Sequence, residues 1–304
     1  MSTPLISSIG PNVRLAATVM IAAPRSVQVA GMEDYRVLLL KRHGAARFMP
    51  NLHVFPGGCA ETADLPSEWP TSWAAQSASP LSFATRMAAV REAYEESGIA
   101  LACSDREHEH DQVQAGRKDP LLGLRWTDSQ RRELLQRRDA VRADARQFRP
   151  ALTASSLRPA LHRMHCWSRW VTPEQERFRY DTFFYLVAAS PAHLVAAEDL
   201  AEVVHADWMS PTEALSSHAA GKLALAPPTW DTLRELSAHR RLDDLLAHAA
   251  GRPECPEPLM PTVSESDDGT KHFILPSHTI TFDSACRRYS SNHLKISPGI
   301  IYLV

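Results

Sequence analysis

A nine-residue run at positions 91–99 spaces three carboxylates as one face of a helix requires. It reads Arg-Glu-Ala-Tyr-Glu-Glu-Ser-Gly-Ile and places Glu92, Glu95 and Glu96 at i, i+3 and i+4. Apolar residues at helical spacing precede it, and Gly98 follows the last carboxylate, which predicts a helix that ends at this glycine. Because like charges so close repel one another, the spacing indicates either a bound cation or a plain acidic surface. Oxygen ligands favour Mg²⁺ or Mn²⁺ as the cation.

The segments upstream of the run favour the cation. Residues 37–40 form a short apolar run typical of a buried strand, and a second extended piece at 53–55 leads into Pro56-Gly57-Gly58. Paired glycines allow unusual backbone conformations and close approach to a ligand. We therefore expect a strand, a glycine turn and then the acidic helix, with a backbone carbonyl of the turn completing the metal coordination.

These residues together resemble the signature of the Nudix hydrolase superfamily. The match comprises Gly58, an acidic residue six positions later at Asp64, and then Arg91, Glu92, Ala93, Glu95, Glu96, Gly98 and Ile99. Asp64 stands where the family usually has Glu. The segment between Asp64 and Arg91 has 26 residues where the signature has seven, a surplus of 19 that we place at about 65–83. The prolines and tryptophans of this insertion predict an ordered excursion that is neither a helix nor a flexible linker.

The resemblance implies an α/β fold, a Nudix-type α/β/α sandwich with a mixed central sheet, the insertion and added helices. It implies hydrolysis of a diphosphate linkage with Mg²⁺ or Mn²⁺ held by the three glutamates and by the carbonyl of Gly57. Arg91 would orient a carboxylate of the site. A further acid would act as base, and Glu202 is preferred over Glu198 and Asp199. Substrate phosphates would contact Arg42, Arg47 and Gly58.

The split signature, a Phe-Met-Pro-Asn segment at 48–51 and a Trp-Val-Thr-Pro segment at 170–173 resemble one branch of the superfamily. That branch is the peroxisomal-type acyl-coenzyme A diphosphatases and their bacterial relatives, matched over about 12–245. Coenzyme A or acyl-coenzyme A is then the expected substrate, a small-molecule nucleotide derivative. Hydrolysis of ADP-ribose, NADH or a capped RNA end is the alternative. A Nudix-fold binding module without catalysis is the alternative of another class.

The chain divides by pattern into a Nudix domain at 10–250 and a Pro-rich C-terminal extension at 251–304. Within the domain, 127–148 is strongly helical and rich in arginine, either as a phosphate-binding face or as a solvated helix, which we favour. The polar stretch at 105–120 holds His108 and His110, either as a metal site or as an exposed loop, and we favour the loop.

The composition of the chain bears on its binding partners and its cellular compartment. The formal net charge of −2 argues against an extended nucleic-acid-binding face. No apolar run long enough to span a membrane occurs, so no membrane segment is expected. Five cysteines without metal-binding spacing fit a reducing compartment, and we expect a cytoplasmic protein. A homodimer is an open option.

Overall fold

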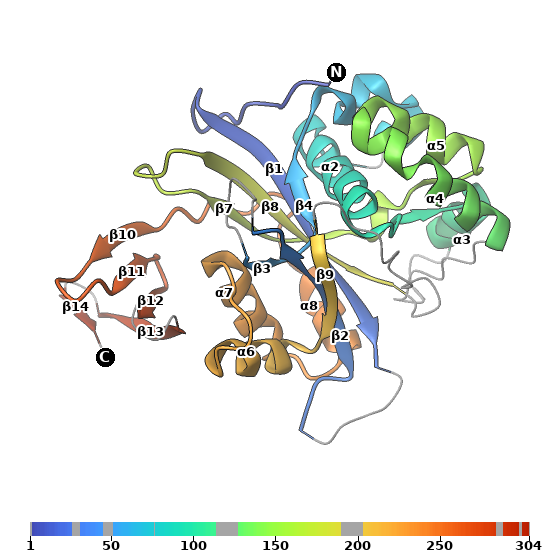
Figure 1. Cartoon of the computed structure of the whole chain (residues 1–304). Helices are drawn as coiled ribbons and strands as arrows, with labels where there is room; N and C mark the ends of the chain where they lie inside the picture. Colours follow the sequence, from blue (N-terminus) through green and yellow to red (C-terminus); the bar gives the residue numbers. More distant parts are fainter. Residues whose placement is uncertain are drawn as a thin grey trace.

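The computed structural model describes residues 2–25, 31–44, 51–75, 77–113, 127–189, 203–283, 288–297 and 300–303. A twisted mixed sheet runs through the middle, with one group of helices on each of its faces (Figure 1). A second, smaller sheet is built from the C-terminal residues. The expected α/β/α sandwich is confirmed.

The central sheet has the strand order β3-β2-β1-β8-β7, with β4 paired to β1 and β9 to β2. Its strands are β1 (Val13–Pro24), β2 (Tyr35–Arg42), β3 (His53–Val54), β4 (Gly57–Cys59), β7 (His165–Val171), β8 (Arg179–Ala188) and β9 (Val203–Met209). β1 and β8 run parallel over ten residue pairs, whereas the other pairings are antiparallel. The sheet is therefore mixed, and β1 lies at its centre.

Side chains alternate between two cores along β1. Leu15, Val19 and Ile21 face the core under α2 (Pro80–Ser97), whereas Met20 and Ala22 face the opposite core. The helices over the opposite core are α6 (Pro211–Ala219), α7 (Pro227–Leu236) and α8 (Leu242–Ala250). Because β1 is buried on both faces, it reads as a continuous apolar run rather than as an alternating one.

Helix α2 carries the acidic run. Its first turn is capped by the Ser79 side chain, which accepts a hydrogen bond from the Ser82 N–H, and Pro80 occupies the first position. Gly98 ends the helix in the left-handed region, with φ of 72°. The predicted helix and its glycine end are confirmed.

The described part of the insertion is ordered as expected but contains helical turns, so the expectation that it holds no helix is wrong. It begins beside the turn η1 (Thr62–Asp64) and continues through η2 (Pro66–Glu68) and α1 (Thr71–Ala74), and α2 already starts within it at Pro80. Trp69 is buried, and its Nε1–H donates to the Ala63 carbonyl at 2.8 Å. Packing of this tryptophan fixes short turns that the local sequence does not specify.

The expected exposed loop at 105–120 is a helix over the residues described there, α3 (Asp105–Val113). Arg158 of β6 (Arg158–Pro159) and Arg163 of η4 (Leu161–Arg163) form ion pairs with aspartates of this helix, and β6 pairs with β5 (Ala102–Cys103). The His108 ring is buried and lies edge-on to the His162 ring at 4.7 Å between centroids. Contacts with η4 therefore order a segment whose composition is typical of loops.

The predicted helical segment at 127–148 contains α4 (Asp128–Ala143), η3 (Ala145–Gln147) and the start of α5 (Phe148–Ala154). The helix breaks at Asp144, whose extended backbone and side chain cap the following turn. The hydroxyl of Tyr94 on α2 donates a hydrogen bond to the carbonyl of Leu134 on α4, which joins the two helices.

The C-terminal strands are β10 (Thr262–Glu265), β11 (Lys271–Ile274), β12 (His278–Asp283), β13 (Arg288–Ser297) and β14 (Ile300–Leu303). They form an antiparallel sheet in sequence order, apart from the central sheet (Figure 1). His278 Nε2 lies 2.9 Å from Asp231 Oδ1 on α7, and the Tyr289 ring packs near Trp230. No helix in the described ranges is long and apolar enough to cross a membrane.

Candidate functional site

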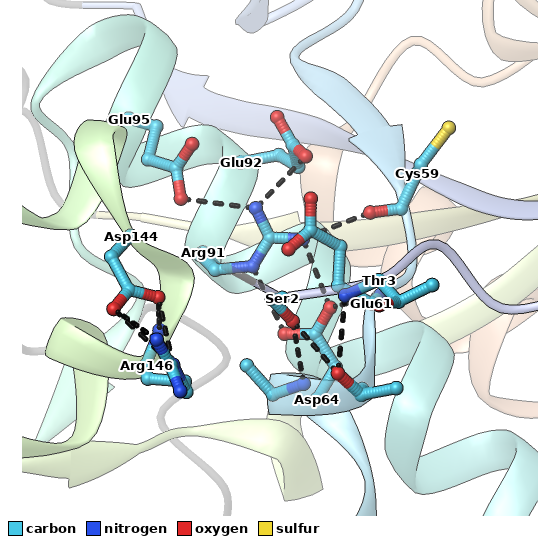
Figure 2. A network of polar contacts seen from close by, with 12 residues as sticks. Ser2, Thr3, Cys59, Glu61, Asp64, Arg91, Glu92, Glu95, Asp144 and Arg146 are labelled. Carbon is cyan, nitrogen blue, oxygen red and sulfur yellow. Dashed lines mark hydrogen bonds and ion pairs between the residues drawn. The ribbon is translucent and has the colours of Figure 1, made fainter.

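Arg91 lies at the centre of the polar network shown in Figure 2. Its side chain is buried, and its Nε–H and one Nη2–H donate to the two oxygens of Asp64 at 3.0 and 2.9 Å. Nη1 donates to Glu92 Oε1 at 2.9 Å and to Glu95 Oε1 at 3.0 Å, and Nη2 also reaches the Cys59 carbonyl at 2.9 Å. The five N–H groups of the guanidinium therefore have five acceptors.

Asp64 is fully buried beneath this guanidinium. Besides Arg91, its Oδ2 accepts the Glu61 N–H at 2.8 Å, which closes the turn η1. Both oxygens are thus engaged within the protein. Sequence reasoning left the contribution of Asp64 undecided, and the structure pairs it with Arg91 across the insertion.

Burial shapes the electrostatics of the two glutamates. Burial raises the pKa of Glu92, although the Arg91 cation opposes the shift. Burial, opposed by Arg91 and assisted by the Glu92 charge, raises the pKa of Glu95 to about 7. For Arg91, burial lowers the pKa, but Asp64, Glu92 and Glu95 outweigh burial and hold the pKa above its ordinary value. One guanidinium therefore leaves the negative charge of this site only partly compensated.

Gly57 and Gly58 lie in strand β4 rather than in the expected turn, because they pair with Thr18 and Ala17 of β1. Neither glycine has a positive φ. The need for glycine is steric: a Cβ on Gly57 would lie 2.4 Å from the Ala17 carbonyl oxygen, and one on Gly58 would lie 2.4 Å from Glu92 Cδ. The Glu92 carboxylate thus rests directly on the backbone of Gly58.

Glu96 reaches the same strand from the next turn of α2. Its Oε2 accepts the Gly57 N–H at 2.9 Å. The structure therefore brings Arg91, Glu92, Glu95 and Glu96 together with Gly57 and Gly58, as the sequence predicted for their positions. β4, hydrogen-bonded to β1, supplies the rigid support.

Known proteins match the chain across this region. The family model of the NUDT19 Nudix domain matches residues 13–81 and 71–236, which is more than half of the chain. The chain belongs to this Nudix family. It is 30% identical over 296 residues to the acyl-coenzyme A diphosphatase NUDT19 of Gallus gallus, covering 84% of this chain and 76% of that protein. The protein of the same name from Xenopus laevis is 29% identical over 277 residues, covering 79% of this chain and 70% of that one.

A solved structure agrees with the fold. The Nudix hydrolase from Alicyclobacillus acidocaldarius superimposes with a TM-score of 0.55 at 24% identity, over 77% of this chain and 96% of that one. The chain is accordingly a Nudix hydrolase, and the expectation of an enzyme is confirmed over that of a binding module without catalysis.

Nudix hydrolases generally use divalent metal ions, and the donor chemistry of this site fits one. Arg91 binds Oε1 of Glu92 and of Glu95, whereas Oε2 of each accepts no hydrogen bond from the described residues. These oxygens are hard ligands on carboxylates whose charge is incompletely compensated. Among the residues that the structure describes, no three acidic, imidazole or thiol side chains meet closely enough to enclose an ion. Among the described residues, the carboxylates of Glu92 and Glu95 are therefore held by hydrogen bonds from Arg91.

Of three further residues predicted to act on the substrate, the structure describes one. Arg42 ends β2, where its N–H donates to the Leu52 carbonyl at 3.0 Å. Arg47 and the preferred base Glu202 lie outside the described residues. Their predicted roles stay predictions.

Arg138 contacts the backbone of the acidic helix, which the sequence did not predict. It belongs to the helix expected to be solvated, yet it is buried, and its Nε–H and Nη2–H donate to the Glu95 carbonyl at 3.1 and 2.9 Å. A cation at the end of a helix also stabilises its negative pole. The only local signal is that arginines recur along α4, which does not distinguish Arg138 from its exposed neighbours.

Proposed function

We propose that this Nudix hydrolase cleaves the diphosphate linkage of coenzyme A or acyl-coenzyme A and depends on Mg²⁺ or Mn²⁺. The observation that carries the proposal is the Arg91 network, which holds Glu92 and Glu95 beside the Gly57–Gly58 strand. Partly compensated carboxylates suit a cation, and a bound cation suits a polyanionic substrate.

Hydrolysis transfers the oxygen of water to one phosphorus and breaks the bond between that phosphorus and the bridging oxygen. The proton of water passes to a base, for which Glu202 stays our candidate, and the bridging oxygen leaves with the second phosphate. From coenzyme A the products are adenosine 3′,5′-bisphosphate and 4′-phosphopantetheine, acylated where the substrate was. The reaction needs charge neutralisation and alignment of water with the bond that breaks.

The chain's own residues would divide this work. Glu92, Glu95 and Glu96, with the Gly57 carbonyl, would hold the divalent ion, which when bound offsets the charge of the diphosphate oxygens. Arg91 holds Glu92 and Glu95 in place and opposes the rise in pKa that burial causes in both, and Asp64 fixes Arg91. Arg42, Arg47 and the backbone of Gly58 would contact substrate phosphates, and the missing side chain at Gly58 makes room for the Glu92 carboxylate.

The choice of substrate is supported by the relatives from Gallus gallus and Xenopus laevis, both named acyl-coenzyme A diphosphatases. The alternatives are ADP-ribose, NADH and capped RNA, which share the diphosphate but differ in what it joins. The net charge of −2 gives no support for binding of long RNA. Four described cysteines are free thiols, which supports a reducing compartment, and we propose the cytoplasm.

A panel of these four substrates with Mg²⁺ tests the proposal. We expect kcat/KM for coenzyme A or an acyl-coenzyme A to exceed that for ADP-ribose, NADH and capped RNA, with the bisphosphate as product. Glu95→Gln should abolish most of this turnover, and Arg137→Gln, an exposed arginine on α4, should leave it intact. Faster turnover of ADP-ribose than of coenzyme A would show that the proposed substrate is wrong. Wild-type protein that hydrolyses none of the four compounds would contradict the proposed activity.

A further inference from the structure

Arg14 lies on the central strand β1, directly beside the strand that supports the candidate site. It is exposed, although the rest of β1 is buried up to Ala23. In the parallel pairing of β1 and β8, Arg14 stands opposite Tyr180. Two residues further along β1, Ala16 stands opposite Cys59, the last residue of β4.

These pairings direct three side chains to the same face of the sheet. Paired residues on neighbouring strands share a face, and so do residues two apart on one strand. Arg14 shares a face with Tyr180 by the first rule and with Ala16 by the second, and Ala16 shares it with Cys59. An arginine and a phenol therefore lie side by side next to the strand of Gly57 and Gly58.

The electrostatics agree with this arrangement and connect it to the carboxylates. Burial raises the pKa of the Cys59 thiol, the charge of Glu92 raises it further, and Arg14 lowers it. Burial likewise raises the pKa of Tyr180, and both Arg14 and Arg42 oppose the shift. The charges of Glu92 and Arg14 thus act on the Cys59 pKa in opposite directions, and a hydrogen bond with Arg14 adds to the lowering.

Arg14 differs from three buried arginines around the central sheet. Arg86, Arg91 and Arg169 each pair with a carboxylate, on Glu254, Asp64 and Asp181 respectively. Within the described ranges Arg14 makes no ion pair, although Glu61 follows Cys59 by only two residues. An exposed guanidinium without a carboxylate, next to a phenol, is suited to a phosphate, which accepts two parallel N–H bonds.

We propose that Arg14 and Tyr180 form a subsite for a phosphate group that the substrate carries in addition to its diphosphate. The inference rests on the proposed function. In coenzyme A this group is the 3′-phosphate of the ribose. Arg14 would bind it through its guanidinium and Tyr180 through its hydroxyl, and Arg42 adds positive potential from β2. The subsite selects for the monoester and takes no part in breaking the diphosphate.

Paired substrates test the subsite. kcat/KM is measured for coenzyme A and for 3′-dephospho-coenzyme A with wild-type protein, Arg14→Gln, Tyr180→Phe and the control Arg137→Gln. We expect Arg14→Gln to lower kcat/KM for coenzyme A by about 10- to 100-fold, the range for a lost charged hydrogen bond, and to change that for dephospho-coenzyme A less than about threefold. Tyr180→Phe should show the same preference with a smaller loss, and Arg137→Gln should change neither. Equal losses on both substrates, or no loss on either, would overturn the subsite.

A binding measurement separates this inference from the proposed function. Calorimetric titration compares adenosine 3′,5′-bisphosphate with 5′-AMP, using wild-type protein and Arg14→Gln that melts at the wild-type temperature. The subsite predicts that wild-type protein binds the bisphosphate more tightly and that Arg14→Gln removes the difference. If wild-type protein shows this preference but hydrolyses no coenzyme A, the proposed substrate is wrong and the subsite stands. If wild-type protein hydrolyses coenzyme A but binds both nucleotides equally, the subsite is wrong.

Discussion

Asp64 and Arg91 form a two-point ion pair that is closed to solvent and joins residues on either side of the insertion. Asp64 is 0% and Arg91 2% exposed, and both carboxylate oxygens engage the guanidinium at 2.9–3.0 Å. Arg91 then contacts Glu92 and Glu95 with its remaining donors. The residue where this chain departs from the common Nudix signature thus anchors the arginine that organises the carboxylates.

Asp64→Asn should destabilise the protein by about 3–5 kcal/mol, because it leaves the Arg91 charge buried without its main partner. Asp64→Glu keeps the charge but adds a methylene to a filled site, at about 1–3 kcal/mol. Urea unfolding monitored by tryptophan fluorescence gives both values. If the two variants are equally stable, the charge of Asp64 does not hold Arg91.

Gly57→Ala and Gly58→Ala should have different consequences. A Cβ at position 57 meets the backbone of β1 at Ala17 and Thr18, so β1 and β4 must separate and the melting temperature should fall. The three nearest atoms to a Cβ at position 58 belong to the end of the Glu92 side chain, so stability should change little while kcat falls about 100-fold.

The control for both variants is Gly251→Ala, whose Cβ would meet its nearest neighbour, the His248 carbonyl, at 3.5 Å. It should leave melting temperature and kcat unchanged. A Gly58→Ala enzyme with full activity would show that the position of Glu92 against this glycine does not matter to the reaction.

Arg138→Gln should lower kcat through the position of Glu95, because Arg138 donates two hydrogen bonds to the Glu95 carbonyl. Loss of charged hydrogen bonds of this kind costs about 1.5–3 kcal/mol of stability. Arg137→Gln, next to it on α4 but exposed and paired with Glu133, should change neither quantity. Identical behaviour of the two variants in melting and turnover would remove Arg138 from the account.

Asp111 should make stability depend on acid pH. Burial raises its pKa, but the hydrogen bonds from Arg163 at 2.5 and 2.6 Å and from His162 at 2.9 Å outweigh burial and lower it. A lowered folded pKa stabilises the protein above the unfolded value near 3.9, and this contribution is lost as the pH falls through the folded pKa. Asp111→Asn should therefore cost about 1–2 kcal/mol at pH 7, and its difference from wild type should shrink towards pH 3.

Chemical unfolding at pH 7, 5 and 3 measures this difference. Asp139→Asn serves as control, because its side chain is 95% exposed and lies 3.7 Å from its partner Arg142. A cost of Asp111→Asn that stays constant down to pH 3 would show that ionisation of this carboxylate does not stabilise α3.

The elements that could be predicted are those whose signals are local. β2 matches its apolar run, and α2 ends at Gly98 as the sequence predicted. The spacing of Glu92, Glu95 and Glu96 predicted that they share a helix. The pair of glycines predicted which segment of the chain lies beside them. Periodicity and capping are properties of short segments, so one sequence is enough to detect them.

The elements that could not be predicted depend on distant partners. β4 is a strand only because β1 accepts it, and the helical turns of the insertion depend on the burial of Trp69. The sequence of α3 is typical of a loop, and the helix is stabilised by a contact of His108 with His162, more than fifty residues later in the chain. A local pattern cannot detect such a contact. The pairing of Asp64 with Arg91 spans 27 residues, and no local pattern distinguishes it from an exposed acid.

The most direct test of the central claim is the binding of Mn²⁺, followed by electron paramagnetic resonance, with hydrolysis of coenzyme A measured on the same samples. If the carboxylates around Arg91 form the metal-dependent site, wild-type protein binds Mn²⁺ and turns over coenzyme A, and chelation abolishes the turnover. Glu92→Gln and Glu95→Gln, folded as judged by melting, should lose both binding and about 100-fold or more of kcat. Wild-type Mn²⁺ affinity and full turnover in both folded variants would contradict the account.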